Sequence, residues 1–131
     1  MIRLSSRGTY AMLIMLELCS CAPGKYIPLK DIAAKYELST KYLERVALIL
    51  SKGGLLDSVR GLDGGYRLNR PPSQYRVSEI LLLAEGNRNE RLLTCNILSG
   101  FNKLWQAAED CHYSILEKKT LEDMLKEQTD I

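Results

Sequence analysis

Residues 60–66 join an arginine to a glycine-rich turn, a combination that suits contact with phosphate. The segment reads Arg-Gly-Leu-Asp-Gly-Gly-Tyr, follows the apolar pair Leu55-Leu56 and precedes an alternating, strand-like run. This pattern predicts a β-hairpin, and the Asp63-Gly64 pair can adopt the positive φ angles of a tight primed turn. Glycines let the backbone approach a phosphate chain closely, and Arg60 supplies the charge. The segment therefore predicts a hairpin that contacts DNA.

A second set of polar side chains lies on the helix predicted for residues 40–52. Apolar residues at i, i+3, i+4 and i+7 form a face that can be buried: Leu43, Val46, Ala47 and Leu50. The first turns of the opposite face carry Thr40, Lys41, Glu44 and Arg45. Recognition helices insert these turns into the major groove, where lysine and arginine pair with guanine, glutamate with cytosine and threonine with the thymine methyl. A solvated amphipathic helix has the same pattern, but the hairpin that follows directly favours DNA recognition.

The elements that must position these side chains can be predicted from local signals. Residues 5–21 form a helix that is apolar on nearly all sides and ends at Pro23-Gly24. A second helix follows Pro28, Ser39 can cap the helix of residues 40–52, and Gly53-Gly54 ends it. We expect a mainly α fold, in which residues 1–76 form a winged helix-turn-helix domain with a small two-stranded wing.

The sequence pattern of residues 77–131 predicts a helical region for dimerisation or sensing. A short helix over residues 77–85 precedes a polar loop that runs to about residue 102, and a long helix follows to about residue 117. Its apolar residues recur at i, i+4, i+7 and i+11, a stripe that can pair with a twin helix. The predicted dimerisation residues are Leu104, Ala108, Cys111 and Ile115, with Trp105 as a packing anchor. Thr120 with Asp123 predicts a capped last helix.

Charge is distributed unevenly along the 131 residues, although the net charge is only +2. Residues 1–76 contain twelve Lys or Arg against six Asp or Glu, whereas residues 77–131 contain six against ten. A basic first part that docks on phosphates and an acidic second part that stays clear of them would explain this segregation. The sequence shows no signal peptide and no apolar stretch long enough to span a membrane, so we expect a cytoplasmic protein.

Together these motifs resemble the bacterial winged-helix repressors of the IscR, NsrR and CymR kind, the Rrf2 family. The matching motifs are Leu4-Ser5, Tyr10-Ala11-Met12, Asp31-Ile32-Ala33, Ser39 with Tyr42-Leu43-Glu44, Gly54-Leu55-Leu56, Ser58-Val59-Arg60-Gly61 and Gly64-Gly65-Tyr66-Arg67-Leu68. The resemblance implies a homodimeric transcription regulator that binds an imperfect palindrome in double-stranded DNA. It implies that Glu44 and Arg60 contact bases or a groove, and that Tyr42 and the wing glycines shape the surface. The full predicted DNA surface is Ser39, Thr40, Lys41, Tyr42, Glu44, Arg45, Arg60, Gly61, Gly64, Gly65 and Arg67.

The four cysteines bear on what the protein senses. Cys19 and Cys21 are two apart in the first predicted helix, which points them to nearly opposite sides. Cluster-binding relatives carry three closely spaced cysteines before the Trp-bearing helix, whereas this chain has only Cys95 there. An iron-sulfur cluster normally needs about four thiolates. We therefore expect no metal and no cofactor within one chain; a cluster would need a dimer-shared or mixed-ligand site.

Without a cluster, three kinds of signal stay open. Cys95 is a candidate redox sensor, with an inert loop cysteine as the equal alternative. A small molecule or a partner protein is a further candidate effector. The glycines do not form a P-loop, because no Gly-Lys-Ser/Thr follows, and the single histidine, His112, has no catalytic partner by spacing, so we expect no enzyme. The alternative function is a winged-helix protein-interaction module that regulates a partner enzyme.

Overall fold

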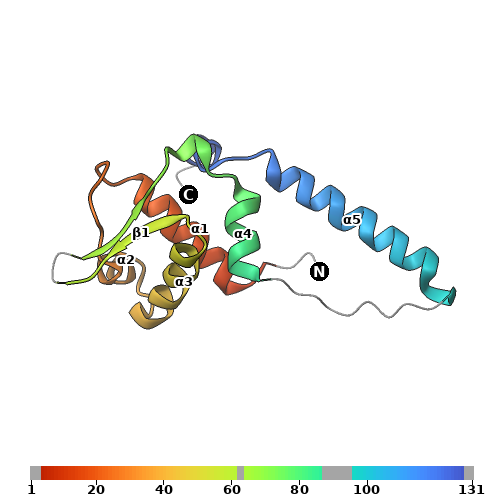
Figure 1. Ribbon diagram of the computed structural model, residues 1–131, viewed down its shortest axis with the longest axis horizontal. Helices are drawn as coiled ribbons and strands as arrows, with labels where there is room; N and C mark the ends of the chain where they lie inside the picture. Colours follow the sequence, from red (N-terminus) through yellow and green to blue (C-terminus); the bar gives the residue numbers. More distant parts are fainter. Residues whose placement is uncertain (1–3, 62–63, 87–95, 129–131) are drawn as a thin grey trace.

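The computed structural model describes residues 4–61, 64–86 and 96–128. Helices dominate, and a single hairpin supplies the two strands of the described sheet (Figure 1). The order is α1 (Ser6–Cys19), α2 (Leu29–Tyr36), α3 (Thr40–Lys52), β1 (Leu56–Val59), β2 (Gly65–Leu68), a 3-10 turn (Pro72–Gln74), α4 (Val77–Glu85), a second 3-10 turn (Asn96–Leu98), α5 (Ser99–Glu117) and α6 (Leu121–Lys126). The predicted mainly α, winged helix-turn-helix fold is confirmed.

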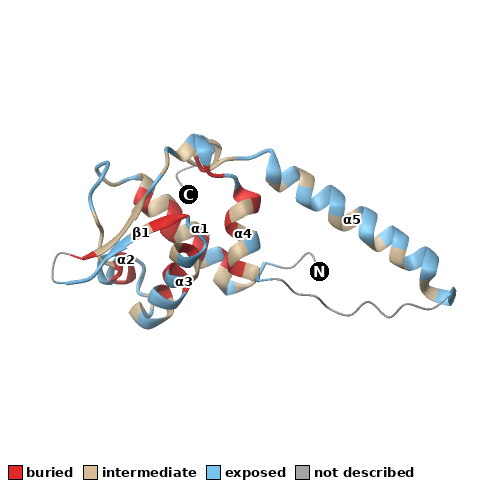
Figure 2. Ribbon diagram, in the orientation of Figure 1, coloured by how far each residue is buried: buried red, intermediate tan, exposed pale blue. Residues whose placement is uncertain are grey.

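The core lies where α1, α3 and α4 pack together (Figure 2). The four α3 residues predicted to face inward are all buried, because the helical period brings them onto one stripe. Ile80 and Ala84 of α4 and Leu121 of α6 belong to the same cluster. The core therefore extends past residue 76, where the sequence suggested a domain boundary.

Local capping explains where the helices begin and end. The Ser39 hydroxyl accepts a hydrogen bond from the Tyr42 amide at 3.3 Å, so the predicted cap of α3 is confirmed. Gly54 adopts φ +82° directly after the helix, in the left-handed region that glycine enters most easily. The prediction for α1 was too long, because the amides of Ser20 and Cys21 bond back to Glu17 and Leu18 in a closing turn. Cys21 consequently lies beyond the helix.

The connection between the two strands of the wing is longer than two residues. β1 and β2 are antiparallel, with Leu56 opposite Leu68 and Val59 opposite Gly65, which leaves residues 60–64 as the connection. Within this connection the Gly64 amide donates to the Gly61 carbonyl at 3.1 Å, and the predicted turn at Asp63-Gly64 can be checked only at Gly64. Gly64 has no positive φ, and Asp63 lies outside the described residues.

A segment before α2 joins the wing and fixes its position. Ile27 and Tyr66 exchange two backbone hydrogen bonds, of 2.9 and 3.0 Å. Gly65 is essential to this contact, because a Cβ there would lie 2.2 Å from the Ile27 carbonyl oxygen. The wing is thus held against the start of α2 and, through Leu55 and Leu56, against the core.

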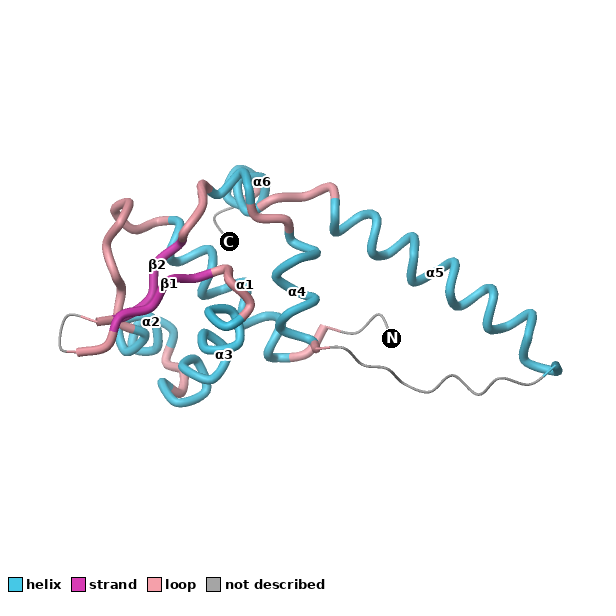
Figure 3. The backbone as a smooth tube through the Cα atoms, in the orientation of Figure 1, coloured by secondary structure: helices cyan, strands magenta, loops and turns pink. Residues whose placement is uncertain are grey.

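The last two helices differ in how they meet the body. α6 lies beside the start of α4, where Val77 donates to the Lys119 carbonyl at 2.8 Å and Leu121 to that of Tyr75 at 3.0 Å (Figure 3). α5 instead projects away from the body (Figure 1). It begins at Ser99, four residues earlier than predicted, and none of its residues is buried. No helix in the described parts of the chain is long and apolar enough to cross a membrane.

Candidate nucleic-acid interface

A hollow of about 640 Å³ lies between α3, the start of α2 and the wing. It is lined by Glu44 and Leu48 from α3, Lys30 from α2, and Arg60 and Tyr66 from the hairpin, with the wing glycines along its rim. The structure thus brings Glu44, one of the predicted α3 contacts, onto one surface with Arg60 and the predicted wing glycines. Its two cations, Lys30 and Arg60, come from different elements and are of the residue types that contact a DNA backbone.

The outer face of α3 supplies polar side chains to this surface. Lys41, Glu44 and Arg45 are exposed, as predicted, and Thr40 is half-buried. Tyr42 lies at the side of the helix, where its ring meets that of Tyr10 edge-on with centroids 5.2 Å apart. Its hydroxyl is 3.3 Å from the Ser6 hydroxyl. Tyr42 therefore positions the first turn of α3 against α1.

Tyr66 is a member of the surface that the sequence pattern did not single out. Burial raises the pKa of its hydroxyl, and the nearby Glu44 carboxylate raises it further, while Arg60 lowers it. The Tyr66 hydroxyl therefore lies close enough to Glu44 and Arg60 to interact electrostatically with both. Because its pKa lies above the ordinary value of 10, the hydroxyl stays protonated at neutral pH and can donate a hydrogen bond. Strand alternation was the available signal, because it puts Tyr66 and Arg67 on opposite faces.

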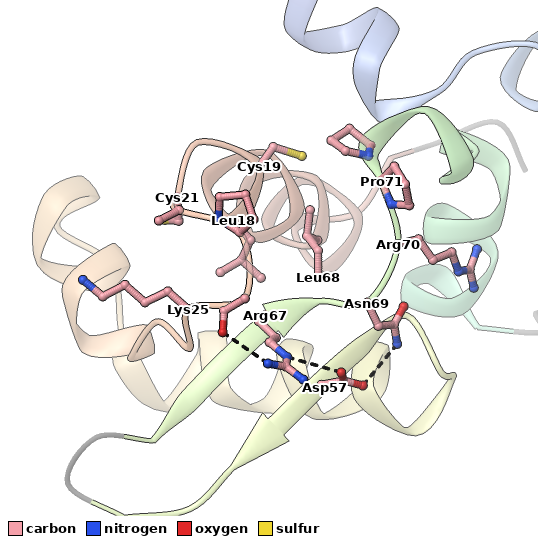
Figure 4. A pocket seen from close by; sticks show the side chains of 14 residues that line it. Leu18, Cys19, Cys21, Lys25, Asp57, Arg67, Leu68, Asn69, Arg70 and Pro71 are labelled. Carbon is pink, nitrogen blue, oxygen red and sulfur yellow. Dashed lines mark hydrogen bonds and ion pairs between the residues drawn. The ribbon is translucent and has the colours of Figure 1, made fainter.

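Arg67, which the sequence predicted to contact DNA, lines a different hollow from the one that Tyr66 lines. Its Nε donates to Asp57 at 3.4 Å and its Nη1 to the Gly24 carbonyl at 3.2 Å (Figure 4). Its guanidinium also lies 4.4 Å from the centre of the Tyr26 ring. There it lines a second hollow, of about 610 Å³, formed by the end of α1 and the outer face of the hairpin. Within one chain, Arg67 thus ties the wing to the loop after α1, and its contact with DNA stays a prediction.

The three cysteines in the described part of the chain lie in two separate places. Cys19 and Cys21 lie at the end of α1, on the second hollow, and Cys111 is exposed on α5. Cys95, the predicted redox sensor, lies outside the described residues. Among the residues that are described, no three His, Cys, Asp or Glu side chains gather closely enough to hold a metal ion. The donor set of this chain therefore does not fit an intrachain four-thiolate cluster.

The predicted dimerisation stripe lies on α5 and faces solvent. Leu104 is 68% exposed and Ile115 is 59% exposed, and Cys111 is also exposed, whereas Ala108 is half-covered. Trp105 stacks on Phe101 with centroids 6.1 Å apart and donates from Nε1 to Glu109 at 3.1 Å. Within one chain, Trp105 therefore packs along its own helix.

A helix-turn-helix whose recognition helix is followed at once by a hairpin, with both lining one charged hollow, defines a winged-helix DNA-binding protein. Residues 4–127 match the Rrf2 family of iron-dependent transcriptional regulators. The chain belongs to this family, and it is a DNA-binding transcriptional regulator.

Individual relatives agree over nearly the full length. The transcriptional regulator IscR of Cereibacter sphaeroides is 31% identical over 137 aligned residues, which cover 96% of this chain and 88% of that protein. CymR of Bacillus subtilis is 31% identical over 122 residues, covering 93% of this chain and 88% of the relative. The solved structure of CymR, the global cysteine regulator of B. subtilis, superposes with a TM-score of 0.83 at 30% identity, covering 98% of this chain and all of that one. These relatives are named as transcriptional regulators, which points to a protein that is not an enzyme.

Proposed function

We propose that this regulator is a homodimeric repressor that binds a palindromic operator through α3 and the wing. The observation that carries the proposal is the shared hollow, which joins Glu44 of the recognition helix to Arg60 of the wing. Glu44 can accept a hydrogen bond from a cytosine amino group, and Arg60 can enter a groove or pair with phosphate. Lys41 and Arg45 add charge on the exposed side of α3, while Ser39, Thr40, Tyr42 and the wing glycines shape the surface.

The exposure of α5 supports the proposed homodimer. A helix of 19 residues is about 28 Å long, and this one carries exposed Leu104 and Ile115 along its length without a buried residue. Such a stripe loses contact with water when it packs on an identical helix. A two-fold axis between two α5 helices would present two copies of α3 to DNA, and a symmetric pair of readers binds a palindrome. Repression rests on the family resemblance.

The DNA surface is tested by replacing Arg60 with alanine. The operator is first selected by the wild-type protein from genomic fragments, and affinity is then measured by gel shift at fixed salt. Loss of one groove contact costs about 1–3 kcal/mol, so we expect Arg60→Ala to weaken binding about fivefold or more. Arg76→Ala is the matched control, because Arg76 is an exposed arginine paired with Glu117 at 3.3 Å, away from the hollow. Equal affinities for the two variants would contradict the proposed surface.

Base reading by Glu44 needs a separate measurement. We expect Glu44→Ala to relax the preference for one base pair in the operator more than it lowers affinity, because a carboxylate adds no attraction to phosphate. Binding to a set of operators with single substitutions measures this preference. An equal loss for every sequence would show that Glu44 does not read a base.

The dimer is tested by placing a charge in the α5 stripe. We expect Ile115→Asp to shift the protein towards monomer in sedimentation at micromolar concentration, and to remove the advantage of a palindrome over a half-site. His112→Asp introduces the same charge on the same helix beside the stripe and serves as the control. A monomeric wild-type protein that prefers no palindrome would overturn this part of the proposal.

A further inference from the structure

One apolar side chain on the recognition helix points outward. Leu43, Val46, Ala47 and Leu50 of α3 are buried, whereas Leu48 is 46% exposed. Leu48 lies on the same face of α3 as the polar candidates. The four positions Lys41, Glu44, Arg45 and Leu48 are spaced at i, i+3, i+4 and i+7. Leu48 therefore extends the face that is proposed to read bases.

Leu48 also lines the hollow between α3 and the wing. Val59 of β1 lies on the same hollow and is likewise 46% exposed, while Glu44, Arg60 and Lys30 form charged parts of its wall. Two half-exposed apolar side chains inside a charged hollow gain stability when an apolar group of a ligand covers them. Along α3, Leu48 is about 6 Å beyond Glu44, or nearly two base steps along a DNA duplex.

In the major groove, the only methyl group on a base edge is the 5-methyl group of thymine. We propose that Leu48 is a specificity-determining residue that contacts a thymine methyl within two base pairs of the base at Glu44. The inference rests on the proposed function, since it requires α3 to enter the major groove. Leu48 carries no hydrogen-bonding group, so it selects thymine by burial of the methyl group alone.

Deoxyuridine is the probe for this contact, because it differs from thymidine only by the missing methyl group. In the operator selected by the wild-type protein, each thymine is replaced in turn by deoxyuridine, and affinity is measured by gel shift. Burial of one methyl group corresponds to about a fourfold change in affinity. We expect about a fourfold loss at one position, or at its symmetric pair, and we expect Leu48→Ala to bind both duplexes equally.

The control is Leu82→Ala on α4, which truncates another exposed leucine, one that does not line the hollow. This variant should keep the fourfold sensitivity to deoxyuridine. The inference is overturned if no position is sensitive, or if Leu48→Ala keeps the sensitivity of the wild type. A uniform loss of affinity in Leu48→Ala without any deoxyuridine effect also overturns it, because the leucine would then contact sugar. Failure of the wild type to select any duplex would instead count against the proposed function.

Discussion

The body of the molecule and α5 use apolar residues in opposite ways. In residues 4–86, side chains such as Ile14, Leu43 and Ile80 are fully removed from water. In α5, Leu104, Phe101 and Ile115 each keep more than half of their surface exposed. A body with its own core can fold as one chain, whereas an exposed apolar helix gains stability only when another surface covers it. One chain therefore carries a complete candidate DNA-binding surface, and α5 is proposed to join two such chains in a symmetric dimer.

Matched leucine truncations test this contrast most strongly. Leu50 is fully buried in the core, so we expect Leu50→Ala to lower the free energy of unfolding by about 2–5 kcal/mol at every protein concentration. Leu104→Ala should lower it only where the protein is dimeric, because only the proposed partner helix would cover the leucine. Urea denaturation over a range of protein concentrations measures both. A large loss of unfolding free energy in Leu104→Ala that does not depend on protein concentration would contradict this contrast between the body and α5.

Thiol chemistry gives a second contrast between the body and α5. Burial, together with a smaller contribution from the nearby Cys21, raises the pKa of the Cys19 thiol to about 11. Against the ordinary value of 9.0, the reactive thiolate at pH 8 is about a hundredfold scarcer than in the unfolded chain. We expect alkylation of Cys19 to be slower by that factor in the folded protein and to speed up as the pH rises towards 11. Mass spectrometry of native and urea-unfolded protein measures both rates.

Cys111 provides the comparison for Cys19. It is exposed on α5, within the proposed dimer stripe, so its alkylation in the folded protein should slow as protein concentration increases. The Cys19 rate should not change with concentration, because the fold of one chain covers it. A concentration effect on Cys19, or none on Cys111, would contradict this assignment of the two surfaces.

The smallest expected effect concerns the cap of α6. The Thr120 hydroxyl accepts from the Asp123 amide at 3.2 Å, and the Asp123 carboxylate accepts from the Thr120 amide at 3.0 Å. We expect Thr120→Ala to lower stability by about 1 kcal/mol, because this cap fixes α6 on the core through the buried Leu121. Ser114→Ala in α5 is the control, with little change expected in thermal or urea unfolding. Equal losses would show that the cap does not anchor α6.

Much of the secondary structure could be predicted because its signals are local. The four buried positions of α3, the Ser39 cap and the capping box at Thr120 follow from spacing within one turn or helix. Errors arose where the signal was weak or distant. Residues 99–102 contain no helix-start motif and were assigned to a loop, yet they form the first turn of α5.

Long-range contacts decided what the pattern left open at the candidate site. The pairing of Ile27 with Tyr66 fixes which face of the wing meets α3. No local pattern in the sequence predicts this pairing. That pairing turns Tyr66 towards Glu44 and leaves Arg67 to bind Asp57 and Gly24 on the far side. Leu48 shows the same limit, because helical periodicity placed it outward but could not show that it shares a hollow with Val59.

The sequence by itself determined the helices, the hairpin, the polar face of α3 and the family to which the chain belongs. These depend on residue type and short spacing, which act within a few residues of chain. Only the tertiary structure decided which side chains share a surface: Glu44, Leu48, Arg60 and Tyr66 on one side of the wing, and Arg67 on the other. That choice depends on how the wing docks on the segment before α2, a contact between residues nearly forty positions apart.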